Sequence, residues 1–143
     1  MAAIFPDEGL DYVLGIWPKA TAAYTSPMKL RLFTSQSAST VIAHNQALAD
    51  ITETAYTSYA PQNLAAATWG ALAERPTNAG RQTTYPQVTF PTVGATGSTI
   101  NGFYVTDNGT TLAVAQANFD DLTAVPLQAN DVIKVTPTVA LLH

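Results

Sequence analysis

INGFYVTDNGTTLAVA, residues 100–115, decides the fold class, because it reads as two alternating strands around Asn108-Gly109. Asn-Gly is typical of a type I′ turn, in which both central residues need φ > 0 and the turn twist matches that of the strands. A slip by one residue would scatter the apolar face, so turn chemistry and hydrophobic pattern agree. The stretch predicts an antiparallel hairpin with a two-residue loop. The pairs predicted on its apolar face are Val105 with Leu112 and Phe103 with Val114.

The β signal continues on both sides of this hairpin. Residues 133–141 alternate apolar and polar side chains, which predicts a long C-terminal strand. Pro137 interrupts it and should lie at an edge or a bulge, because proline has no N–H to donate. Residues 85–90 form a shorter predicted strand, and the prolines around it favour a sheet edge. We therefore expect residues 83–142 to be the β-rich region.

Two elements are predicted nearer the N-terminus. Residues 7–17 place Leu and Val residues and Trp17 at helical spacing after a capping Asp7, which predicts a short helix that Pro18 ends. Its apolar stripe should dock on the sheet or on a neighbouring subunit. Residues 28–32 alternate around Lys29 and Arg31, which predicts a half-buried strand with both cations on a solvated face.

Residues 34–80 are rich in Ser, Thr, Ala and Asn and are predicted to be mostly irregular. Within them, residues 43–51 could form a helix, and residues 63–72 could form either a helical turn or a strand anchored by Trp69. A long excursion of this kind in a compact domain is usually functional or an interaction arm. We therefore expect residues 34–80 to be an interaction region.

The order of these elements predicts a mainly β fold. Short strands separated by turns, without alternation of strands and helices, favour an antiparallel β-sandwich or jelly roll. A chain of 143 residues is most simply one domain, here residues 1–143. The predicted architecture is thus a single sandwich domain with a short N-terminal helix and a long irregular excursion.

The composition excludes several classes of function. Only 11% of residues are charged, against about 25% in ordinary globular domains, so the surface should be largely neutral and prone to association. The net charge is −4 and the six basic residues are scattered, which argues against direct nucleic-acid binding. There is no cysteine and no apolar run long enough to span a membrane. Residues 1–17 lack the basic and apolar segments of a leader, so we expect the chain to be untargeted.

The sequence indicates no catalytic, cofactor-binding or metal-binding residue, and we expect the protein not to be an enzyme. His44 and His143 are the only histidines, and both are expected to be exposed. Beyond His44, only Asp50 and Glu53 are candidates for convergent polar groups. Residues 94–98 resemble a phosphate loop but lack its lysine. The motif G-x-S-x-G is absent.

The remaining acidic and aromatic residues have structural explanations. Neighbouring carboxylates on a strand point to opposite faces and make poor catalytic pairs, and an acidic pair before a helix is explained by capping. An Asp-Asn-Gly turn lacks the further ligands of a calcium loop. Aromatics could form a sugar platform but are more often core or interface residues. The residues concerned are Asp7, Glu8, Asp120, Asp121, Asp107, Tyr56, Tyr59, Trp69 and Tyr85.

Six segments in order carry a family resemblance: EGLDYVL at 8–14, LRLFT at 30–34, LADITE at 48–53, YPQVTF at 85–90, INGFYVTD at 100–107 and DVIKVTPT at 131–138. Together they resemble the small virion proteins of tailed bacteriophages. The resemblance implies a β-sandwich or jelly-roll subunit, made in the bacterial cytoplasm, that joins the virion as a capsid decoration (cement) protein. A neck or tail component and a lectin-like glycan-binding module are the alternatives.

The resemblance also implies the partners. A cement protein binds the major capsid protein and its own copies, so a homotrimer or homodimer is expected, with no direct contact to nucleic acid or membrane. No catalytic residue or cofactor is implied. A neutral surface suits flat, polar, hydrogen-bonded interfaces between subunits. On this resemblance, residues 34–80 and the N-terminal segment should carry most intersubunit contacts. Deletion of residues 36–47 should then abolish particle binding but leave the circular dichroism of a β-domain.

Overall fold

The computed structural model describes residues 27–36, 48–74, 81–95, 99–108, 114–118 and 125–141. These residues form short antiparallel strands and two 3-10 turns, which confirms the mainly β fold class. The turns are η1 (Leu48–Asp50) and η2 (Ala66–Thr68). No helix in the described part of the chain has the length and apolar character needed to cross a bilayer. The predicted helix at residues 7–17 lies outside the described residues.

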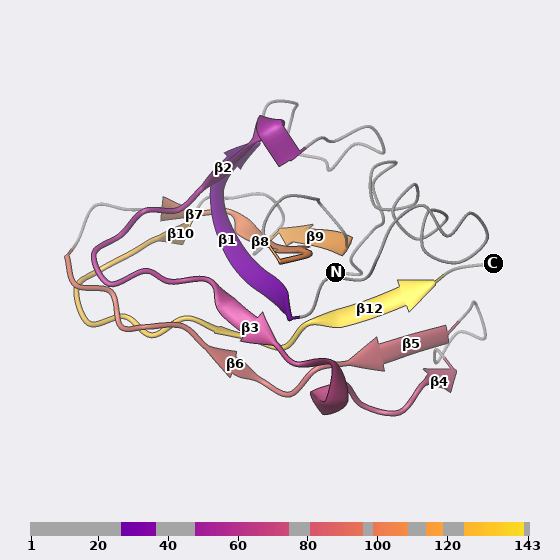
Figure 1. Ribbon diagram of the computed structural model, residues 1–143. Coiled ribbons are helices and arrows are strands. Elements are labelled where there is room, and N and C mark those ends of the chain that lie inside the picture. The colour runs from indigo at the N-terminus through magenta and orange to yellow at the C-terminus, as the bar shows by residue number, and fades with distance from the viewer. Residues whose placement is uncertain are drawn as a thin grey trace.

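The largest sheet is built on β1 (Met28–Gln36), whose long curve runs through the centre of Figure 1. One edge of β1 pairs with β8 (Gly102–Thr106), which in turn pairs with β9 (Val114–Asn118). The other edge pairs with two short strands, β2 (Ile51–Glu53) and β3 (Gln62–Leu64). The predicted strand at 28–32 is confirmed and extends four residues further, to Gln36.

The predicted hairpin is confirmed as an antiparallel β8–β9 pair, but its predicted register is wrong. Val105 lies opposite Val114, and Phe103 lies opposite Ala117. The ladder shifts between these two pairs, an irregularity of the bulge type that the alternating pattern does not reveal. With Val105 opposite Val114, the strands lie two residues away from the register that a loop of Asn108 and Gly109 alone would set.

Two chain segments, residues 81–89 and 134–141, run antiparallel side by side and form two strand pairs in succession, here called the ribbon. β5 (Arg81–Thr84) pairs with β12 (Thr138–Leu141), and β6 (Val88–Thr89) pairs with β11 (Lys134–Val135). The predicted strand at 133–141 is therefore broken in two at Pro137. Four residue steps from Thr84 to Val88 face three from Thr138 to Val135, so the extra residue lies on the strand opposite Pro137. In the described residues β11 and β12 each pair with one strand only, which agrees with the edge position predicted for Pro137.

Three smaller strands complete the four antiparallel sheets of the described residues. β4 (Ala73–Glu74) adds to β5, and β7 (Thr99–Ile100) pairs with β10 (Val125–Pro126). The predicted strand at 85–90 is shorter than expected, because only its middle residues join a ladder. Within the described residues β6 pairs with β11 alone, which agrees with the predicted edge position. The proline on each side explains both outcomes, since it removes a backbone donor.

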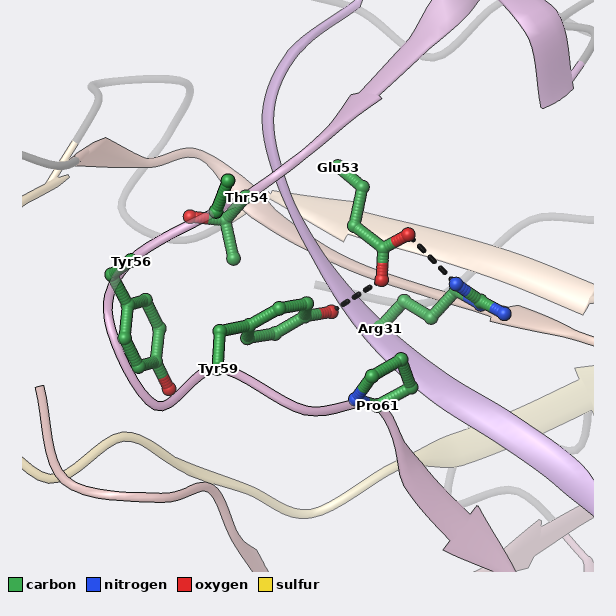
Figure 2. Close-up of a pocket in the computed structure, with 7 residues that line it drawn as sticks. Arg31, Glu53, Thr54, Tyr56, Tyr59 and Pro61 are labelled. Carbon is green, nitrogen blue, oxygen red and sulfur yellow. Dashed lines mark hydrogen bonds and ion pairs between the residues drawn. The ribbon is translucent and has the colours of Figure 1, made fainter.

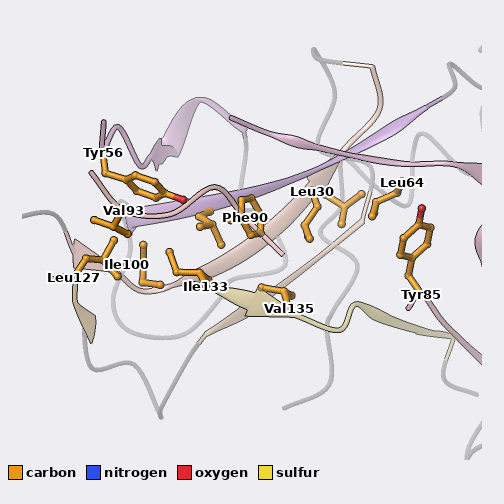
Figure 3. Close-up of a cluster of buried hydrophobic side chains, with 12 residues drawn as sticks. Leu30, Tyr56, Leu64, Tyr85, Phe90, Val93, Ile100, Leu127, Ile133 and Val135 are labelled. Atoms are coloured by element: carbon orange, nitrogen blue, oxygen red, sulfur yellow. The ribbon is translucent and has the colours of Figure 1, made fainter. Parts of the chain in front are cut away.

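The main core lies between the β1 sheet and the ribbon (Figure 3). Leu30 and Leu32 of β1 are fully buried there, and Val105 of β8 is 1% exposed. The predicted face assignment within β8 is thus correct: Phe103 and Val105 contact this core, whereas Tyr104 joins a second cluster with Phe33 and Ile51. The buried residues of the main core are Leu30, Leu32, Tyr56, Leu64, Tyr85, Phe90, Val93, Ile100, Val105, Leu127, Ile133 and Val135.

The region predicted to be mostly irregular, residues 34–80, is more ordered than expected in its described part. It contributes the end of β1 and all of β2, β3 and β4, besides both 3-10 turns. Strands of two or three residues are too short to show a periodic pattern, so they cannot be predicted from the sequence. Trp69 does anchor its segment: its ring packs edge-on against Tyr85 at 5.2 Å between centroids.

Candidate functional site

The candidate site begins at a gap in the edge of β1. β3 pairs with Met28 to Leu30, and β2 pairs with Phe33 to Gln36, so the backbone of Leu32 falls between the two strands. The carbonyl of Leu32 accepts a hydrogen bond from the backbone N–H of Thr54 at 3.0 Å. The N–H of Leu32 donates to the hydroxyl of Tyr59, also at 3.0 Å. A side chain therefore completes the edge where the chain leaves the ladder.

The same hydroxyl starts a polar network, drawn in Figure 2. Tyr59 donates to Oε1 of Glu53 at 2.7 Å, and Nη1 of Arg31 contacts Oε2 of Glu53 at 2.7 Å. Nε of Arg31 donates to Oγ1 of Thr106 at 3.2 Å. The Arg31 and Glu53 side chains are only 16% and 30% exposed, so this ion pair is screened less than a surface pair.

This network corrects the predicted role of Arg31. The sequence placed Lys29 and Arg31 together on a solvated face, but Arg31 is half-buried and paired with Glu53. Glu53 lies on β2 directly opposite Phe33, two residues along β1 from Arg31. The pairing therefore depends on a strand that the sequence does not reveal.

Burial sets the ionisation of the tyrosines around this network. Desolvation raises the pKa of Tyr59 well above its ordinary value, and the nearby carboxylate of Glu53 adds to the shift. Desolvation likewise raises the pKa of Tyr104, the residue opposite Arg31 across β1 and β8. Burial also raises the pKa of Tyr56. The phenols of Tyr59 and Tyr104 stay protonated through the physiological range and serve as hydrogen-bonding groups.

The loop between β2 and β3 holds Tyr59 in place. The N–H of Tyr59 donates to the carbonyl of Tyr56 at 2.9 Å, which closes a turn whose third residue, Ser58, has φ of 79°. The ring of Tyr59 lies parallel to that of Phe90 with 6.1 Å between centroids. The turn meets a second loop at Gly94, whose N–H donates to the carbonyl of Thr57 at 3.3 Å.

Around this network lies an open depression of about 610 Å³. Its polar groups are largely engaged with one another: both carboxylate oxygens of Glu53 accept hydrogen bonds, and the Tyr59 hydroxyl both accepts and donates. A catalytic role for either residue would require breaking bonds that hold the β1 edge. The oxygen Oγ1 of Thr54 is buried and has no hydrogen-bond partner among the described residues. The lining residues are Arg31, Glu53, Thr54, Ala55, Tyr56, Tyr59 and Pro61.

The other candidate residues do not converge on this network. Asp50 is exposed in η1, and Asp107 is 6% exposed just after β8. In the parts of the chain that are described, no three acidic or histidine side chains gather where they could hold a metal ion. Outside the described residues lie His44, His143, Asp7, Glu8, Asp120, Asp121 and residues 96–98 of the glycine-rich loop.

The four aromatics considered for a sugar platform are packing residues, as the sequence favoured. Tyr56 and Tyr85 are 4% and 9% exposed, and their hydroxyls bond to the backbone at Pro91 and Ala65. Tyr59 and Trp69 are partly buried and contact the main core. These four rings therefore present no open stacking face shared between them.

Comparison with known proteins identifies no relative: no family model matches the chain, and neither the curated proteins nor the solved structures contain a significant match.

Proposed function

We propose that this protein is a structural subunit of a tailed-bacteriophage virion, most simply a decoration (cement) protein bound to the outside of the capsid. It performs no catalysis and works with the major capsid protein and with its own copies, as a trimer or dimer. We also propose a sandwich architecture, with the β1 sheet as one layer and the ribbon as the other. The contact of both with one core supports this arrangement.

The observation that carries the proposal is an ordered, uncharged surface within the predicted interaction region. Residues 65–73, here called the strap, are all exposed except the half-buried Trp69. The strap contains five alanines and no charged residue, and Leu72 is 68% exposed. Small uncharged side chains let another protein approach the strap closely. One cation borders it, because Nη2 of Arg81 donates to the carbonyl of Leu72 at 3.1 Å.

The strap is held by its backbone, so its shape is set before binding. The N–H of Gly70 donates to the carbonyl of Thr84 at 2.9 Å, and Thr83 Oγ1 donates back to the carbonyl of Gly70 at 2.8 Å. The N–H of Ala65 donates to the Tyr85 hydroxyl at 3.1 Å. A preordered surface loses less conformational entropy on association, which favours a role in assembly.

The polar network supports the same conclusion. Its most convergent ionisable groups, Arg31 and Glu53, are used to join strands to the β2–β3 loop. A subunit that reinforces a capsid under internal load needs a rigid fold more than a reactive pocket.

The test is to purify virions from a bacterial culture that produces a phage encoding this protein. We expect the chain to co-sediment with assembled heads in a copy number comparable to the major capsid protein, as quantitative mass spectrometry would measure. A copy number an order of magnitude or more lower would assign it to the neck or tail. Its absence from the particles would refute a virion role, and saturable binding on a glycan array would then favour the lectin-like alternative.

A further inference from the structure

The chain contains two Asn-Gly pairs, at residues 101–102 and 108–109, and the fold treats their asparagines differently. We propose that Asn108 is a site of spontaneous deamidation, whereas the fold protects Asn101 from the same reaction. The proposal does not depend on the function proposed above.

The reaction needs no enzyme and no oxidant. The backbone nitrogen of the residue after asparagine attacks the side-chain carbonyl carbon, a C–N bond forms, and the side-chain nitrogen leaves as ammonia. Water then opens the resulting succinimide on either side and gives aspartate or isoaspartate. The net change is one water consumed and one ammonia released. Glycine favours the attack because it has no side chain to hinder it and gives the backbone more freedom.

Asn108 meets the requirement for access. β8 ends at Thr106, and Asn108 is exposed two residues later. It therefore lies beyond the last residue that the β1–β8 ladder holds, which is Thr106 opposite Lys29. Its side chain can reorient without breaking a strand pair.

Asn101 is held on both sides of the reacting bond. Its side-chain Nδ2 donates to the carbonyl of Thr34 at 2.8 Å, and its backbone N–H donates to the carbonyl of Phe33 at 2.8 Å. Gly102, which would supply the attacking nitrogen, is buried in β8 between Phe33 of β1 and Asn118 of β9. Succinimide formation there requires a local opening of the central sheet.

The modification would change the protein at one defined place. Each event adds a negative charge to a chain of net charge −4 and sets it next to Asp107, whose side chain is 6% exposed. Isoaspartate also inserts a methylene group into the backbone that joins β8 to β9. The share of modified chains would therefore record the age of a preparation.

The experiment follows the intact folded protein during incubation at mildly alkaline pH, below its unfolding temperature. Peptide mapping by mass spectrometry and labelling by an isoaspartyl methyltransferase locate and count the products. We expect product at Asn108 and a rate at Asn101 lower by about tenfold or more, because Asn101 reacts only from opened molecules. Asn63 and Asn130, exposed but followed by Leu64 and Asp131, are internal controls and should also react slowly.

The same incubation in urea separates the effect of the fold from that of the sequence. In the unfolded chain both Asn-Gly pairs should react at similar rates, and Gly109→Ala should slow Asn108 alone. Similar rates at Asn101 and Asn108 in the folded protein would overturn the proposal. So would an intact Asn108 in folded protein under conditions in which the unfolded chain reacts.

Discussion

The hydroxyl of Tyr59 accepts a hydrogen bond from the backbone N–H of Leu32 at 3.0 Å. Leu32 lies on β1 between the residues that pair with β3 and those that pair with β2. A side chain thus does the work of a missing strand residue. Because the same hydroxyl donates to Glu53, the edge of the central strand and the half-buried ion pair share one atom. Loss of this hydroxyl should therefore weaken both the edge of β1 and the ion pair.

Replacing Tyr59 with phenylalanine removes this shared atom and keeps the ring against Phe90. We expect Tyr59→Phe to lower the free energy of unfolding by about 1–3 kcal/mol, because a buried donor and a carboxylate each lose a partner. Urea denaturation measures the change. Tyr56→Phe is the matched control: its hydroxyl makes one neutral bond, to Pro91, and should cost only about 1 kcal/mol. Equal losses in the two variants would contradict the role of the network.

The Arg31–Glu53 pair should behave as a coupled unit. In a double-mutant cycle of Arg31→Met and Glu53→Gln, we expect a coupling energy of about 0.5–3 kcal/mol from urea unfolding. Most of the single-variant loss comes from leaving a half-buried charge without its partner. A parallel cycle of Lys29→Met with Glu53→Gln should show much weaker coupling. A coupling energy near zero for Arg31 and Glu53 would show that solvent already screens their contact.

The buried phenols predict a loss of stability at alkaline pH. Tyr59 and Tyr104 have pKa values raised in the folded state above their ordinary value of 10.0. Their contribution is complete below about pH 10 and is lost as the pH rises further, because the unfolded chain then releases protons that the folded chain keeps. Unfolding free energies measured from about pH 8 to pH 11 should fall at the upper end. Tyr59→Phe should flatten that fall; an unchanged slope would argue against the burial of this phenol.

Two substitutions in the loops beside the site should act in opposite directions. Ser58 has φ of 79°, a conformation that glycine adopts more readily, so Ser58→Gly should raise stability by about 0.5 kcal/mol or leave it unchanged. At Gly94 a Cβ would lie 3.0 Å from Cβ of Thr57, so Gly94→Ala should be destabilising. Thermal unfolding of both variants tests the pair. A more stable Gly94→Ala protein would mean that these loops are less tightly packed than the contact indicates.

The strap gives a test of assembly that is separate from folding. Leu72→Ala removes an exposed side chain and should change stability by less than about 0.5 kcal/mol. On the proposed function it should weaken binding to heads that lack the protein, as a co-sedimentation assay would show. Val132, which is 48% exposed outside the strap, provides the control: Val132→Ala should bind normally. Equal losses of head binding in the two variants would show that the strap is not part of the interface.

The sequence predicted the elements whose pattern repeats often enough to be read. The alternation in β1 and β8 assigns Leu30, Leu32 and Val105 to one side of the sheet, and each is buried in the main core. Pro137 marks the break between β11 and β12, because proline cannot donate a backbone hydrogen bond. Both signals are local and need no knowledge of partners.

The hairpin register and the candidate site were beyond the reach of that pattern. The ladder shift between Phe103 and Val105 depends on the whole sheet, and the turn motif alone cannot report it. Glu53 reaches Arg31 only because a three-residue strand brings it there, across 22 positions in sequence. The sequence identifies Tyr59 only as an isolated aromatic residue. Its hydroxyl bonds to Leu32 because β2 and β3 leave that residue of β1 unpaired, and residue spacing does not predict such a gap.

The closure of β1 bears on how this protein behaves when crowded. Exposed strand edges are templates on which other chains add strands, and they promote aggregation. Between Lys29 and Phe33, β1 is covered on one edge by β8 and on the other by β3, the Tyr59 hydroxyl and β2. The central strand of the largest sheet is thereby withheld from edge-to-edge pairing, which removes one template for aggregation at high protein concentration.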